Sequence, residues 1–116
     1  MSREALNELA DLRRLDPLLE ANVQGVIRIL TYATDEMPLV GGFSIWRIEK
    51  LVDQRVLAFR LKDEQQIGKL RIFFLRIPQC NFVTGVHQRV PDLYELEHPA
   101  VRRAYNYWAV RRSLCQ

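Results

Sequence analysis

The sequence predicts an α+β protein in which two N-terminal helices pack on a small, mainly antiparallel β-sheet of three to four strands, with a C-terminal helix. Three observations predict it. Apolar residues recur at helical spacing through residues 2–33, alternate with a period of two through most of residues 43–89, and return to helical spacing after Pro99. A chain of 116 residues is long enough to bury one core, so we treat residues 1–116 as a single domain.

Capping residues mark both N-terminal helices. Ser2 is a candidate N-cap of the first helix, and Asp16-Pro17 supplies an N-cap and a first-turn proline for a second helix that reaches about Ala33. We expect the charged side chains of the first helix, including Glu4 and Glu8, to face solvent. The predicted packing stripes are Leu6, Leu9, Leu12 and Leu15 in the first helix and Leu18, Leu19, Val23, Val26, Ile27 and Leu30 in the second.

Four strands follow a Pro- and Gly-containing loop over residues 35–42. The predicted strands span residues 43–49, 56–62, 69–77 and 82–89, with hairpin loops at residues 63–68 and 78–81. Alternation puts Leu70, Ile72 and Phe74 on the face that packs against the helices.

The last third of the chain predicts a crossing loop and one helix. Residues 90–97 show no period and carry Tyr94, and His98-Pro99 opens the C-terminal helix. Its predicted buried stripe is Val101, Ala104, Tyr105 and Trp108, and its predicted solvent face is Arg102, Arg103, Asn106 and Arg111.

Composition excludes several classes of protein. Hydrophobic residues make up 48% and charged residues 27% of the chain, which excludes collagen, a coiled coil and a wholly disordered chain. No apolar run approaches the roughly 20 residues of a membrane span, and residues 1–4 lack signal-peptide features. We therefore expect a cytoplasmic protein with no membrane partner. Cys80 and Cys115 fit neither a disulfide framework nor a metal site, so we interpret both as incidental thiols.

Basic residues are concentrated in the second half of the chain. Residues 1–59 hold 7 basic and 9 acidic side chains, whereas residues 60–116 hold 10 and 5, and 14 of the 17 basic residues are arginine. The planar guanidinium suits bidentate binding of phosphate, which favours a polyanionic partner. Genomic composition explains the same arginine bias equally well.

Alternation also predicts a cationic sheet face. The alternating pattern places four basic residues together on the sheet face that points away from the helices: Arg60, Lys62, Lys69 and Arg71. His87 and Arg89 on the last strand can lie on the same face. Like charges side by side destabilise a sheet unless an anion neutralises them, so this face is a candidate phosphate-binding surface. The competing interpretation is an ordinary solvated face of an antiparallel sheet.

The residue types on that face suit RNA cleavage. His87 and His98 do not form a zinc-ligand spacing, and the sequence has neither a Gly-rich phosphate loop nor a Gly-x-Ser-x-Gly motif. We therefore expect no metal and no small-molecule cofactor. Arginines can hold a phosphate while His87, Tyr94 or Lys62 moves protons, which is the chemistry of a metal-independent endoribonuclease.

The order of elements resembles the RelE/ParE superfamily of bacterial toxins over residues 2–107. The resemblance lies in the two opening helices, in Phe59-Arg-Leu-Lys62, in Gly68-Lys-Leu-Arg-Ile-Phe-Phe74 and in Val83-Thr-Gly-Val-His-Gln-Arg89. The family's first strand precedes its first helix, whereas this sequence begins at the helix. We therefore expect either that residues 43–49 take an edge position in the sheet or that the sheet is smaller than the family's.

The resemblance implies a toxin that cleaves mRNA on the ribosome and is inhibited by an antitoxin protein. In the ribosome-dependent mRNA-cleaving branch the matching catalytic positions are Arg60, Lys62, Arg71, Arg89 and Tyr94. In other branches a histidine on the last strand is catalytic, and His87 matches it. We also expect Lys69, Arg102 and Arg103 to bind RNA. The alternative is a non-catalytic binding module, either a ParE-like topoisomerase inhibitor or an inactive relative that binds another protein.

Overall fold

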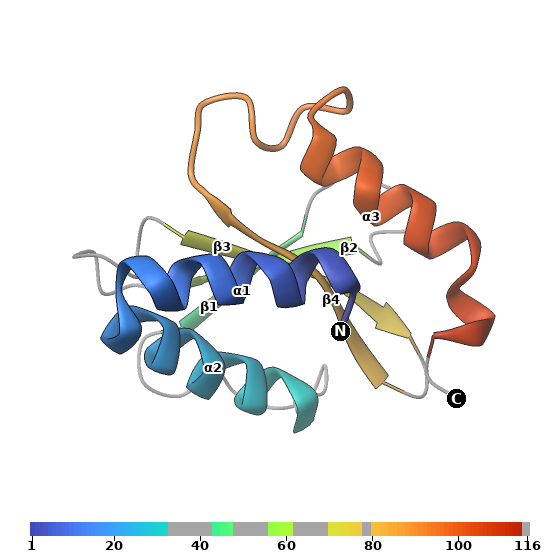
Figure 1. Ribbon diagram of the computed structural model, residues 1–116. Helices are drawn as coiled ribbons and strands as arrows, with labels where there is room; N and C mark the ends of the chain where they lie inside the picture. The colour runs from blue at the N-terminus through green and yellow to red at the C-terminus, as the bar shows by residue number, and fades with distance from the viewer. Residues whose placement is uncertain (33–42, 48–55, 62–69, 78–79, 115–116) are drawn as a thin grey trace.

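The structure is a computed structural model that describes residues 1–32, 43–47, 56–61, 70–77 and 80–114 (Figure 1). It is an α+β fold with two N-terminal helices, an antiparallel sheet and a C-terminal helix, which confirms the predicted class and element order. Side chains are described except at residues 29, 31–32, 43–47, 56–57 and 59–61.

Helices α1 (Arg3–Leu15) and α2 (Pro17–Tyr32) begin at the predicted caps. The Oγ atom of Ser2 accepts the Ala5 N–H at 3.0 Å, and Oδ1 of Asp16 accepts the Leu19 N–H at 3.1 Å. Each side chain therefore pairs one of the amide groups that a helix N-terminus leaves without a partner.

The buried stripe of these helices differs from the prediction at three leucines. Leu6, Leu15 and Leu18 are 54%, 84% and 81% exposed. Helix α1 buries Leu9 as predicted and also Ala5, which was not predicted, because the helix is turned so that its small first-turn alanine packs in the core. The predicted residues of α2 that are described as buried are Val23, Val26, Ile27 and Leu30.

One antiparallel sheet contains strands β1 (Phe43–Arg47), β2 (Val56–Leu61), β3 (Leu70–Ile77) and β4 (Cys80–Gln88), in the order β1-β2-β3-β4. Strand β1 pairs with β2 at one edge, and β4 forms the other edge.

Strand β4 begins two residues earlier than predicted. Cys80 and Asn81 pair with Ile77 and Arg76, so they are strand residues and not part of a hairpin loop. Cys80 is disulfide-bonded, and the interpretation of this residue as an incidental thiol is wrong.

A β-bulge interrupts the pairing of β3 with β4. Phe73 lies opposite Gly85, but the next residue, Phe74, lies opposite Val83, so Thr84 is the extra residue. A bulge leaves backbone groups outside the regular ladder and changes the direction of nearby side chains. The Thr84 carbonyl therefore accepts hydrogen bonds from groups outside the sheet, Oγ of Ser2 and Nη1 of Arg103.

Helices cover both faces of the described part of the sheet, so the predicted exposure of Arg71 is wrong; the side chains of Arg60, Lys62 and Lys69, which were predicted to share its face, lie outside the described part of the structure. One core packs α1 and α2 on Leu70, Ile72 and Phe74, as predicted. A second core packs helix α3 (Pro99–Ala109) on Phe73 and Leu75, on the opposite face. Strands buried on both faces are continuously apolar, and β3 has this character apart from Arg71 and Arg76. Figure 1 shows α3 apart from the α1–α2 pair, with the strands between them.

Helix α3 begins where the sequence predicts. Its N-cap is His98, whose Nδ1 accepts the Ala100 N–H at 3.0 Å, and Pro99 occupies the first turn. Val101 and Ala104 are buried, whereas Tyr105 and Trp108 are half-buried. Among the described residues, none of the helices has the length and apolar character needed to cross a membrane.

Candidate functional site

Several predicted site residues lie away from the rest. Arg89 is exposed just beyond β4, and Arg102 is exposed on α3. Arg60 pairs with Ser44 through the backbone, but its side chain is outside the described part of the structure. Lys62 and Lys69 lie outside the described residues altogether.

Arg71 is a buried residue with fixed partners. Its side chain lies in the second core and the residue is only 3% exposed. Nη1 donates to the Leu70 carbonyl at 2.9 Å, and Nε donates to the Tyr94 hydroxyl at 3.1 Å. These hydrogen bonds satisfy a charge that burial would otherwise make costly. Two of the predicted site residues, Arg71 and Tyr94, are therefore in direct contact.

His87 lies next to this pair. It is opposite Arg71 in the β3–β4 ladder, and its ring meets the edge of the Phe73 ring with centroids 5.0 Å apart. Tyr94 stacks on the same Phe73 at 5.9 Å. The structure thus brings Arg71, His87 and Tyr94 together around one aromatic ring.

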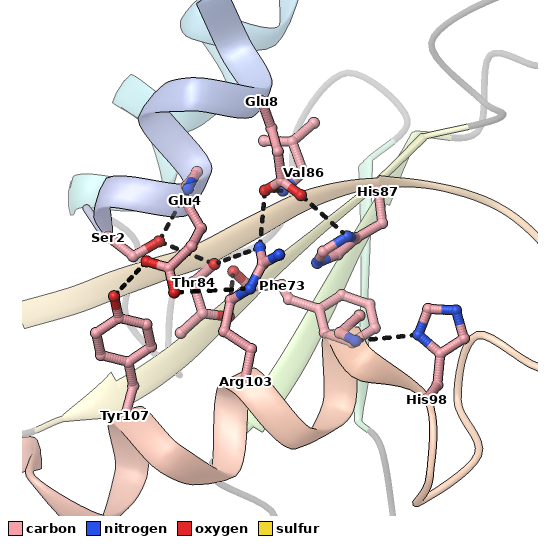
Figure 2. A network of polar contacts seen from close by, with 12 residues as sticks. Ser2, Glu4, Glu8, Phe73, Thr84, Val86, His87, His98, Arg103 and Tyr107 are labelled. Atoms are coloured by element: carbon pink, nitrogen blue, oxygen red, sulfur yellow. Dashed lines mark hydrogen bonds and ion pairs between the residues drawn. The ribbon is translucent and has the colours of Figure 1, made fainter. Parts of the chain in front are cut away.

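Glu8 on α1 completes this group, although the sequence predicted a solvent-facing residue (Figure 2). Its Oε1 accepts the Val86 N–H at 3.1 Å and Arg103 Nη1 at 2.9 Å. Its Oε2 lies 3.5 Å from Nδ1 of His87. One carboxylate therefore contacts the edge strand, a guanidinium from α3 and the imidazole at the same time.

Arg103 faces inward, so its predicted place on the solvent face of α3 is wrong. Besides Glu8, Nη1 donates to the Thr84 carbonyl at 3.3 Å, and Nε lies 3.9 Å from Oε2 of Glu4. The Thr84 bulge and the two acids of α1 draw this arginine towards the edge of β4. It is consequently engaged within the protein, whereas the adjacent Arg102 is exposed.

A second set of contacts joins the ends of α1 and α3. The Tyr107 hydroxyl donates to Oε1 of Glu4, and Oγ of Ser2 donates to the Thr84 carbonyl at 2.9 Å. The bond from Tyr107 is the main cause that lowers the pKa of Glu4, and the same bond raises the pKa of Tyr107.

A sequence signal for these contacts exists. Glu4 and Glu8 are four residues apart, and so are Arg103 and Tyr107. Residues four apart share one face of a helix. Glu4 and Glu8 thus lie on one face of the first helix, and Arg103 and Tyr107, which can donate to them, lie on one face of the last helix. This spacing predicts a contact between the two helices once they are known to be adjacent.

Electrostatics keep His87 neutral. Burial above all, followed by the charges of Arg103 and His98, lowers its pKa to about 4. Because a carboxylate only accepts, we assign the single ring proton to Nδ1, which faces Glu8. Nε2 then carries a lone pair, and it has no hydrogen-bond partner among the described residues.

Comparisons of this chain with protein-family models, with curated proteins and with solved structures find no significant match.

Proposed function

We propose that this protein is a metal-independent endoribonuclease of the RelE/ParE type, the toxin of a toxin–antitoxin pair that cleaves mRNA on the ribosome. The observation that carries the proposal is the Glu8–His87 pair. It presents a neutral imidazole with a fixed tautomer and a free lone pair beside Arg71 and Tyr94. A neutral imidazole with an unprotonated nitrogen is the form of histidine that can accept a proton at neutral pH.

In the proposed reaction His87 acts as the base. Nε2 takes the proton of a ribose 2′-hydroxyl while its oxygen forms a bond to the adjacent phosphorus. The P–O5′ bond then breaks, and the products are a 2′,3′-cyclic phosphate and a 5′-hydroxyl. Glu8 stabilises the imidazolium that forms, since its Oε2 already lies beside Nδ1.

Arg71 and Tyr94 act on the phosphate and on the leaving group. Arg71 is held by the Leu70 carbonyl and by Tyr94, so its charge is already oriented for the extra negative charge of the pentacoordinate phosphorane. Because the Tyr94 oxygen accepts from Arg71, the hydroxyl proton is directed elsewhere and can pass to O5′. Solvent returns the proton from His87 to Tyr94.

Access to the base requires a local movement. Nε2 of His87 is enclosed and the ring is mostly buried. Arg103 lies near the ring, and the turns at residues 91–98 carry Tyr94, which stacks on the Phe73 ring that His87 contacts. In the proposed mechanism Arg103 and these turns shift aside when RNA on the ribosome binds.

The test is cleavage of mRNA by the purified protein added to translating ribosomes. We expect cut mRNA with 2′,3′-cyclic phosphate ends, loss of cutting in His87→Ala, and reduced cutting in Tyr94→Phe. Arg13→Ala, an exposed change at the end of α1, is the matched control and should cut normally. Uncut mRNA with the folded native protein would overturn the nuclease proposal.

The burial of the site favours a second candidate, the non-catalytic binding module. Arg71 is 3% exposed and Nε2 of His87 is enclosed, as expected of groups that only hold a fold together. This candidate predicts intact mRNA in the same assay. A ParE-like activity would appear as inhibition of topoisomerase supercoiling that survives His87→Ala.

A further inference from the structure

Gly85 lies directly beneath the His87 ring. It is two residues before His87 on β4 and opposite Phe73, so it belongs to the face covered by α3. A Cβ atom built at Gly85 would be 2.2 Å from Nε2 and 2.6 Å from Cε1 of His87. It would also be 2.9 Å from Nη1 of Arg103. The ring and the guanidinium therefore meet over the backbone of this residue.

We propose that Gly85 is a positioning residue for His87, because the space left by its missing side chain holds the imidazole against Glu8 and Arg103. Gly85 contacts neither substrate nor reacting atoms in this proposal. It acts through the position of the ring, and it deepens the proposed function, since that ring is the proposed base.

Position 85 requires a residue without a side chain, because the His87 ring occupies that space. A Cβ atom does not approach other non-bonded atoms closer than about 3.0 Å, so any side chain at residue 85 must displace the atoms above it. Those atoms belong to His87 and Arg103 side chains, which can rotate, whereas the β4 backbone is held by its pairing with Phe73. A methyl group at residue 85 would therefore displace the His87 ring and weaken its contacts, while the β4 backbone stays in place.

Displacement of the ring has a measurable consequence. A ring lifted away from residue 85 leaves Oε2 of Glu8 and becomes more accessible to water. Burial is the main cause of the low pKa of His87, so the pKa should rise towards the ordinary value of 6.5. The fixed tautomer should be lost as well, because the Nδ1 proton no longer faces a carboxylate.

The experiment is an NMR titration of the histidine rings in the full chain, with Gly85→Ala compared against the native protein. We expect the His87 pKa to rise from about 4 to above about 5 and its nitrogen shifts to show mixed tautomers. Gly25→Ala is the matched control, because a Cβ at Gly25 meets nothing within 4 Å. Its His87 titration should equal that of the native protein.

A double variant keeps the proposal testable if Gly85→Ala unfolds. In His87→Ala the ring is absent. Adding Gly85→Ala to this variant should therefore lower the urea midpoint by less than about half of the drop that Gly85→Ala causes in the native protein. An unchanged His87 titration in a folded Gly85→Ala protein, or an equal loss in both backgrounds, would overturn the proposal. Neither measurement uses RNA, so this outcome is separate from failure of the nuclease assignment.

Discussion

The guanidinium of Arg103 donates to the carboxylate of Glu8 at 2.9 Å, although the two residues are 95 positions apart in the chain. Helices α1 and α3 cover opposite faces of the sheet, and this bond joins them around the β4 edge. The same carboxylate accepts the Val86 N–H from that edge. An edge strand whose polar groups are paired in this way offers less of a template for another chain.

Arg102 and Arg103 are adjacent but should respond differently to alanine. Arg103→Ala removes hydrogen bonds to Glu8 and to the Thr84 carbonyl and leaves the half-buried carboxylate of Glu8 without its guanidinium partner. We expect it to lower the free energy of unfolding by about 2–3 kcal/mol. Arg102→Ala should change it by less than about 0.5 kcal/mol, because that side chain is exposed. Urea denaturation of both variants is the measurement, and equal losses would contradict the described role of Arg103.

Glu8 and Asp11 provide a matched pair on α1, since each contacts an arginine. Glu8→Ala should cost about 2–3 kcal/mol because it leaves the Val86 N–H without its acceptor and removes the carboxylate that Arg103 contacts. Asp11→Ala breaks only an exposed contact with Arg14 and should cost under about 1 kcal/mol. Thermal unfolding of the two variants compares them directly. A neutral Glu8→Ala would mean that the contact between α1 and α3 contributes nothing.

Acidification should destabilise the protein through His87. Its pKa is about 4 in the folded state and near 6.5 in the unfolded chain, so between these values the unfolded chain binds the extra proton. Stability therefore falls as the pH drops from 6.5 to 4, by up to about 3 kcal/mol from this group. Urea denaturation at pH 7 and pH 4.5 measures the loss. The His87→Gln variant should lose correspondingly less, and an equal pH dependence would contradict the assignment.

Arg71→Ala should be strongly destabilising, in contrast with the expectation for an exposed sheet arginine. The change removes the donors to the Leu70 carbonyl and to Tyr94 inside the second core. We expect a loss of about 2–4 kcal/mol. Arg89→Ala, an exposed change just beyond β4, is the control and should be close to neutral. Melting temperatures of both proteins decide the point, and an unchanged melting temperature for Arg71→Ala would be the contrary result.

The elements were predictable from the sequence wherever local chemistry decides them. The side chains of Ser2, Asp16 and His98 cap the three helices, so the first residue of each helix can be predicted from the local sequence without knowledge of the tertiary structure. Leu15 and Leu18 were misassigned because apolar spacing does not show how far the sheet extends beneath a helix. The start of β4 was misplaced because Cys80 and Asn81 resemble turn residues until their pairing with β3 is known.

The site was only partly predictable for a different reason. Alternation correctly put Arg71 on the face away from α1 and α2, but it does not show what covers that face. The apolar character of Phe73 and Leu75 on that face is the signal that a further layer packs there. Glu8 and Arg103 were assigned to solvent because their partners lie on other elements, and charge periodicity within one helix carries no information about such partners.

The described contacts of α1 with distant polar groups also bear on how the chain matures during synthesis. Ser2 donates to the backbone of residues 83 and 84, Glu8 contacts residue 103, and Glu4 contacts residue 107. Because α1 is translated before α3, these polar contacts of α1 can form only after residues 103 and 107 have been synthesised. Chains stalled before α3 should hold α1 loosely and be cut there by protease. Chains that include α3 should resist the same treatment, so that protection of α1 reports the synthesis and docking of α3.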